Sequence, residues 1–224
     1  MEERKKRVTA PRIAATLSAL LAGATLYTVS GSERQGIQVM EYDAATEAAD
    51  STIMVYMNGS DLEGDYGAAT ADLQEMMAAL VKMGQEGRAP SLHVVVEAGG
   101  STRWELEEMD GVSYARFVLT EDGVSAMEPM EIRNMGEADT LTDFINYGVQ
   151  SYPASHYGLI LWNHGGGPVG GYGSDSHFGG DGLSLEEIRE AADHSVMADS
   201  AFDFVAFDAC LMGSVEIAGC LEGK

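Results

Sequence analysis

Residues 158–173 read GLILWNHGGGPVGGYG, an apolar run that ends in a single histidine, His164, with a cluster of glycines behind it. A short apolar run bounded by glycine is typical of a strand buried on both faces of a parallel sheet. An imidazole followed by glycines would add little apolar surface to a hydrophobic core. His164 is therefore a candidate functional residue at a strand end, and it needs a partner elsewhere in the chain.

A second run of the same kind, FDFVAFD at 202–208, is followed closely by Cys210. Apolar patterning predicts further buried strands at 52–57 and 92–100. Helical periodicity marks three segments, the last opened by a capping-box pair of Ser184 and Glu187: 73–84, 139–153 and 184–194. Strands and helices alternate, which predicts an α/β fold with a largely parallel sheet covered by helices.

Two local predictions concern the remaining segments. The pair Asp110-Gly111, between TRWELEEM and VSYARFVL, is a turn signal and predicts a β-hairpin there. The stretch ACLMGSVEIAGCLEG at 209–223 has a helical pattern that puts Cys210 at the start of a helix. One continuous helix would separate Cys210 from Cys220 by about 15 Å. A disulfide needs Cα atoms within about 7 Å, so the two cysteines are not expected to be bonded to each other.

The charge balance limits the classes of partner. The 224 residues include 13 basic and 36 acidic residues, for a net charge of −23, and six of the basic residues lie within the first 34. Nucleic acid needs a basic footprint, so a nucleic-acid-binding function is excluded. The acidic surface suits either attraction of cationic substrates or simple solvation of the protein.

The N-terminus has the pattern of a targeting segment. In residues 1–31 a basic flank precedes an apolar stretch, IAATLSALLAGATLYTV, and a polar exit follows. We expect a signal peptide, cleaved after Ala24 or near Gly31. The alternative is an N-terminal membrane anchor, because the apolar stretch of roughly 17 residues is close to the length of about 20 that a spanning helix needs. Residues 32–50 are expected to be a linker. The protein is therefore expected to be secreted or to lie in the cell envelope, with any membrane attachment made only through the N-terminal segment.

His164 and Cys210 occupy equivalent positions after two buried strands. They are 46 positions apart with one predicted helix between them, so a right-handed crossover would set the two strands side by side. In open parallel sheets, functional residues gather beyond the carboxyl ends of the strands. A cysteine thiolate near an imidazole is a nucleophile, and the imidazole then protonates the leaving amine. Glycines after the histidine let backbone N–H groups approach a developing oxyanion.

These motifs resemble a known family. LILWNHGGG followed by FVAFDACLMGSVEIA is similar to the clostripain family of cysteine peptidases, in the same clan as caspases and gingipains. The opening IMVYMNGSDLEG, with its DLQEM helix, resembles the start of that family's catalytic domain. The resemblance implies a caspase-like three-layer sandwich with a mostly parallel sheet. Residues 51–224 would then be a clostripain-like catalytic domain, incomplete at its C-terminus because the family's domain continues past the cysteine helix.

The resemblance also implies an activity and a set of site residues. The family comprises cysteine endopeptidases that cleave peptides and proteins after arginine or lysine through a thioester acyl-enzyme. His164 would be the catalytic histidine and Cys210 the nucleophile, with the backbone N–H groups of Gly165 and Cys210 as the oxyanion hole. Asp208 would pair with the cationic side chain of the substrate, or else cap the next helix. Calcium is a possible cofactor because some members of the family depend on it.

Three alternatives remain open from the sequence. The chain could be a catalytically silent binding or regulatory fragment on the same fold. It could be an α/β-hydrolase esterase, since HGGG is an oxyanion motif there, although the Gly-x-Ser-x-Gly elbow of that fold is absent. A zinc site using His164 and His177 is the weakest alternative, because their spacing matches no ordinary ligand pair.

Two more features of the interval between His164 and Cys210 carry expectations. Asp175 and Asp181, in a glycine-rich stretch, are expected to be solvated turn residues rather than metal ligands. The family often matures by a cut in this interval, but Arg189 is its one lysine or arginine here. Because Arg189 falls inside a predicted helix, self-processing at that position is not expected.

Overall fold

The computed structural model describes residues 48–87 and 91–224. The predicted signal or anchor segment, 1–31, and nearly all of the predicted linker lie outside the described residues. No helix within the described ranges is long and apolar enough to cross a membrane. The first strand begins at Ala49, two residues before the domain boundary expected from the sequence.

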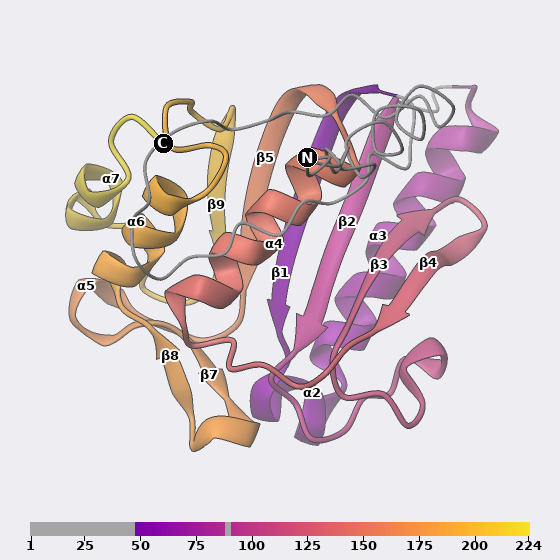
Figure 1. Ribbon diagram of the computed structural model, residues 1–224. Coiled ribbons are helices and arrows are strands. Elements are labelled where there is room, and N and C mark those ends of the chain that lie inside the picture. The colour runs from indigo at the N-terminus through magenta and orange to yellow at the C-terminus, as the bar shows by residue number, and fades with distance from the viewer. Residues whose placement is uncertain (1–47, 88–90) are drawn as a thin grey trace, which may run out of the picture.

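A six-stranded sheet in the order β4-β3-β2-β1-β5-β9 forms the centre of the fold (Figure 1). The strands are β1 (Ala49–Asn58), β2 (Leu92–Gly99), β3 (Ala115–Thr120), β4 (Gly123–Pro129), β5 (Ala154–Trp162) and β9 (Phe204–Asp208). β2, β1, β5 and β9 run parallel, whereas β3 and β4 are antiparallel additions at one edge. The α/β fold with a mostly parallel sheet is therefore confirmed.

Helices cover both faces of this sheet. The helices of the described residues are α2 (Ser60–Tyr66), α3 (Ala68–Gln85), α4 (Ala138–Ser151), α5 (Gly167–Gly170), α6 (Leu185–His194) and α7 (Val215–Cys220). Two 3-10 turns, η1 (Glu107–Met109) and η2 (Ser176–Phe178), accompany them. α3 packs on one face, and α4 and α6 pack on the other (Figure 1). The predicted capping box of Ser184 and Glu187 opens α6, with both of its hydrogen bonds present.

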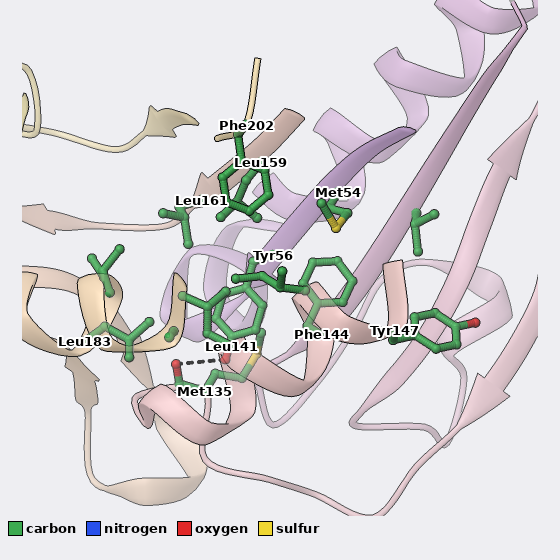
Figure 2. Packing of buried hydrophobic residues seen from close by; sticks show 14 of the residues in the cluster. Met54, Tyr56, Met135, Leu141, Phe144, Tyr147, Leu159, Leu161, Leu183 and Phe202 are labelled. Atoms are coloured by element: carbon green, nitrogen blue, oxygen red, sulfur yellow. Dashed lines mark hydrogen bonds between the residues drawn. The ribbon is translucent and has the colours of Figure 1, made fainter. Parts of the chain in front are cut away.

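Each face of the sheet has its own apolar core. On the α4 side, Tyr56 of β1 packs against Phe144, and its hydroxyl donates to the carbonyl of Met135 at 3.1 Å (Figure 2). On the α3 side, Leu73 is fully buried against the apolar side chains of β1 and β2. The buried face of α3 is shorter than the periodicity over 73–84 predicts, because Val81, near the end of that segment, is 37% exposed.

The hairpin predicted at Asp110-Gly111 is wrong. Residues 101–106 form no strand, and the antiparallel pair is instead β3 with β4, joined at Glu121-Asp122. Leu106 and Met109 are buried in the α3-side core, so hydrophobic contacts hold this segment as a loop over the sheet. The Asp-Gly signal that makes the turn is Asp122-Gly123, where Gly123 has φ of 112°.

The helix predicted to follow Cys210 directly is also wrong. Cys210 lies in a turn, and α7 begins only at Val215, capped by the Ser214 side chain. Leu211 takes a left-handed φ of 63°, which a helix cannot accommodate. Both cysteines are free, as expected, although the single continuous helix used in that argument is absent.

The glycine-rich segment after His164 is folded. It forms a small antiparallel sheet in the order β6-β7-β8, with bounds β6 (Gly165–Gly166), β7 (Gly171–Asp175) and β8 (Asp181–Leu183). The Tyr172 hydroxyl of β7 donates to the carbonyls of Tyr56 and Trp162, at the ends of β1 and β5. The small sheet is thereby fastened to the carboxyl edge of the central sheet.

Candidate active site

The two strands that precede His164 and Cys210 are neighbours. β5 and β9 are parallel and paired in register, with Trp162 opposite Asp208. His164 and Cys210 each follow two residues after that pair. The backbone N–H of Asn163 continues the pairing by donating to the carbonyl of Asp208 at 3.3 Å. The two residues therefore leave the same edge of the sheet from adjacent strands.

The segments beyond those strands remain in contact. A Cβ atom built on Gly165 would come within 2.0 Å of the carbonyl oxygen of Cys210 and within 2.7 Å of the Met212 side chain. Only glycine fits at position 165 without displacing backbone. The residue after His164 thus packs directly on the backbone of Cys210.

Cys210 is exposed, and the backbone directly after it is strained. The next residue, Leu211, has φ of 63°, a conformation that costs a non-glycine residue about 1–2 kcal/mol. The Leu211 side chain is 74% exposed, so apolar burial does not offset this cost. Strain of this kind clusters at functional sites. The helix N-terminus that the sequence suggested beside the thiol is absent, which leaves the imidazole as the expected activating group.

His164 is held through both its backbone and its ring. Its carbonyl accepts the N–H of Gly173 at 3.0 Å. Its ring nitrogen Nε2 lies 3.0 Å from Oδ1 of Asp61, in the first turn of α2. Partial burial opposes ionisation of Asp61, but hydrogen bonds from His164 and Ser60 outweigh it and lower the pKa of the Asp61 carboxyl. Asp61 is therefore a carboxylate at neutral pH.

A buried asparagine, Asn163, links the end of β5, which carries His164, to the end of β1, which precedes Asp61. Asn163 is 4% exposed, and its Nδ2 donates to the carbonyl of Asn58 and to Oγ of Ser60, the latter at 2.8 Å. Ser60 has a left-handed φ of 48°. Three non-glycine residues in the described chain have positive φ, and two of them flank site residues. Ser60 immediately precedes Asp61, and Leu211 immediately follows Cys210.

Asp208 lies at the same edge, at the exposed end of β9. As the register partner of Trp162, it shares that residue's face of the sheet, the face covered by α3. Its role in binding a cationic side chain remains a prediction. The same is true of the oxyanion role of the Gly165 and Cys210 N–H groups.

The acidic residues of the glycine-rich segment have structural partners. Asp175 is fully buried rather than solvated, and it accepts the N–H groups of Met135 at 2.9 Å and His177 at 2.8 Å. Asp181 is exposed and accepts Nδ2 of Asn134 at 2.7 Å. Within residues 48–87 and 91–224, no three His, Cys, Asp or Glu side chains are grouped so as to hold a metal ion.

Sequence reasoning missed Asp61, although a signal for it existed. Asp61 follows the apolar strand 52–57 closely, as His164 and Cys210 follow theirs. Applying the same strand-end rule to β1, which pairs with β5, would have brought Asp61 into the candidate site.

Comparison with solved structures gives the same fold. The chain is similar to a secreted C11 cysteine protease from Bacteroides thetaiotaomicron in complex with an irreversible peptide inhibitor, with TM-score 0.57, 23% identity, and coverage of 78% of this chain and 46% of that one. It is also similar to an inactive zymogen C11 protease from Parabacteroides distasonis, with TM-score 0.51, 21% identity, and coverage of 80% and 47%. The chain therefore spans about half the length of these structures.

Comparison of sequences identifies the family. The chain is 30% identical to clostripain of Hathewaya histolytica over 194 residues, which are 75% of this chain and 35% of that protein. The clostripain family pattern, C11, matches residues 55–224. Because both matches are to cysteine peptidases, the esterase function that the HGGG motif suggested is set aside. The chain belongs to the clostripain family of cysteine peptidases.

Proposed function

We propose that this chain carries the catalytic residues of an endopeptidase that cleaves after arginine or lysine, with Cys210 as the nucleophile and His164 as its acid–base partner. The observation that supports this most directly is the register of β5 and β9. Trp162 and Asp208 are paired, so His164 and Cys210 leave adjacent strands at the same edge.

The chemistry needs only these two side chains and backbone donors. His164 accepts the thiol proton of Cys210, and the sulfur attacks the peptide carbonyl carbon, forming a C–S bond. The oxyanion so formed accepts hydrogen bonds from the N–H groups of Gly165 and Cys210. The C–N bond then breaks, the amine leaves with the proton from His164, and a thioester remains. Water, deprotonated by His164, hydrolyses the thioester and regenerates the thiol.

The preference for basic residues is assigned to Asp208. Its carboxylate is exposed at the edge where Cys210 lies, and a guanidinium or ammonium group is its natural partner. The net charge of −23 would also raise the local concentration of cationic peptides. Asp208 thus supplies a specific contact, and the surface charge supplies attraction at longer range.

The targeting segment at 1–31 supports export of the protein to the medium or the cell envelope. Peptide and protein substrates with basic residues would be met there. Calcium dependence is proposed only from family resemblance, and it is tested by turnover with and without a chelator.

The test is turnover of fluorogenic peptides by the full-length gene product. We expect cleavage of peptides ending in Arg or Lys, and little cleavage of a matched peptide ending in Leu. Cys210→Ala should lower kcat by about 10³-fold or more. Asp208→Asn should lower kcat/KM for the basic peptides by about 10-fold or more while the variant stays folded.

Retained turnover in Cys210→Ala would remove this residue from the mechanism. Undiminished preference for Arg and Lys in Asp208→Asn would refute its assignment. A folded full-length protein that hydrolyses none of these peptides would favour the silent binding or regulatory alternative.

A further inference from the structure

We propose that Asp61 is a positioning residue for His164: it holds the imidazole with the proton on Nε2 and leaves Nδ1 as the nitrogen that exchanges protons with Cys210. The catalytic meaning of this inference rests on the proposed peptidase function. The hydrogen bond and the tautomer it selects can be tested without any turnover.

The tautomer follows from which atoms can donate. Nε2 of His164 and Oδ1 of Asp61 are 3.0 Å apart. An ionised carboxylate only accepts hydrogen bonds, and a neutral imidazole carries one N–H. The proton must then be on Nε2, so the lone pair available to a thiol is on Nδ1. When His164 becomes an imidazolium during the reaction, the neighbouring carboxylate stabilises the added charge.

The backbone under Asp61 is built to hold it. Ser60, which precedes it, accepts the side-chain N–H of Asn163 and the backbone N–H of Leu62. Further along α2, the carboxylate of Glu63 is fully buried, and it accepts N–H and O–H of Thr70 and N–H of Glu105. Hydrogen bonds thus hold the short helix in place on both sides of Asp61, and they fix the position from which its carboxylate contacts His164.

Stability does not explain the pair. The side chains of His164 and Asp61 are 48% and 55% exposed. Ion pairs this exposed contribute about 0–1 kcal/mol to folding. The contact therefore contributes little to the free energy of unfolding, whereas fixing the ring beyond the strand that neighbours β9 has a direct use in proton transfer with Cys210.

The first experiment is ¹⁵N NMR of the imidazole rings, recorded at a pH where they are neutral. We expect His164, assigned with His164→Gln, to show protonated Nε2. Asp61→Ala should shift it toward a mixture of tautomers. Asp65→Ala, in the same helix at another exposed carboxylate, should leave the His164 signals unchanged.

The chain contains an internal reference for this measurement. Nδ1, not Nε2, of His156 lies 2.8 Å from Oδ1 of Asp203 at the opposite edge of the sheet. Its spectrum should show the other tautomer and should not respond to Asp61→Ala. A protonated Nδ1 on His164, or a His164 tautomer indifferent to Asp61→Ala, overturns the inference whatever the protein's activity.

The second experiment uses the full-length protein and the peptides described above. Asp61→Ala should lower kcat by about 10–10³-fold with KM nearly unchanged, because the residue acts through His164. Asp61→Glu keeps the carboxylate and should recover part of the loss, while Asp65→Ala should match wild type. Wild-type kcat in Asp61→Ala would refute the positioning role. If Cys210→Ala also remains active, the peptidase mechanism itself fails, and only the NMR result bears on Asp61.

Discussion

The backbone of Gly165 lies against the carbonyl of Cys210, with no room for a side chain between them. A Cβ atom at position 165 would meet that oxygen at 2.0 Å, and the obstacle is backbone that no rotamer change can move away. The segment after β5 and the segment after β9 therefore hold each other in place. Any group larger than hydrogen at Gly165 must push the two site segments apart.

Gly165→Ala is expected to destabilise the protein by about 1–3 kcal/mol, the usual cost of overpacking, and to lower turnover sharply. Gly213→Ala is the matched control, because a Cβ there would meet nothing within 4 Å and its φ is negative. Urea unfolding of both variants measures the difference. Equal midpoints for Gly165→Ala and wild type would mean that the contact is not as close as the structure has it.

Alkylation should distinguish the two cysteines. Cys210 is exposed, whereas Cys220 is half-buried and its thiol donates to the carbonyl of Leu185 at 3.2 Å. Limiting iodoacetamide should therefore modify Cys210 at least about tenfold faster, because thiol reactivity follows exposure and thiolate character. Peptide mass spectrometry reads the order, and in urea both sites should react alike. Faster labelling of Cys220 in the folded protein would contradict the structure.

The pKa of Asp61 should respond to its partner. It is lowered because hydrogen bonds from His164 and Ser60 outweigh partial burial, so His164→Gln should raise it toward the ordinary aspartate value of about 3.9. Since the folded-state pKa is the lower one, the stabilising contribution of the pair is present above the unfolded-state pKa. It is lost as pH falls through the folded-state value. Carboxyl ¹³C titration measures the shift, and an unchanged Asp61 titration would show that the hydrogen bond is not formed in solution.

Arg189 should resist self-cleavage. It lies inside α6, where it donates to Asp193 at 2.8 Å and to the carbonyls of Cys220 and Glu222 at 2.9 and 3.1 Å. Proteolysis takes place mainly in exposed, loosely ordered segments, and this helix would have to unfold first. Incubation of the active full-length protein should yield no fragment ending at Arg189 by mass spectrometry. Such a fragment, lost in Arg189→Gln, would refute the expectation.

The buried charges of β2 and β3 should be sensitive to removal of one partner. Arg116, 1% exposed, pairs with Glu97 at 2.5 Å and with Asp143 of α4 at 2.8 Å. Arg116→Met leaves the fully buried Glu97 carboxylate without its cation, which should cost about 3–5 kcal/mol. Glu97→Gln combined with Arg116→Met should recover part of that loss in urea unfolding. Arg103→Met, at an exposed pair, should change stability by under about 1 kcal/mol.

Local patterns were sufficient for the parallel core and for two residues of the candidate site. The runs LILW and FVAF are apolar on both faces, which predicts strands buried in a parallel sheet with polar residues at their ends. The structure buries most of LILW, whereas no residue of β9 is fully buried and Phe204 is 43% exposed. His164 and Cys210 were therefore found from strand ends alone. The family motifs around them then gave the chemistry to expect.

Local patterns failed where a tertiary contact opposed a local preference. The segment before Asp110-Gly111 carries a hairpin signal, but burial of Leu106 and Met109 against the core keeps it out of the sheet. The residues after Cys210 have helical spacing, yet the contact of Gly165 with the Cys210 backbone and the left-handed Leu211 accompany a turn there. In both places a tertiary contact outweighs propensities that are worth only fractions of a kilocalorie per residue.

The sequence by itself determined the four parallel strands and the three helices predicted between them, the strand ends that carry His164 and Cys210, and the family. Only the tertiary structure decided that Asp61, 103 positions from His164, meets its ring. It also decided that Gly165 packs on Cys210 and that Asp175 is buried. Periodicity reports which side of an element faces the core, whereas contacts between the ends of different strands depend on register and crossover, which no local pattern encodes.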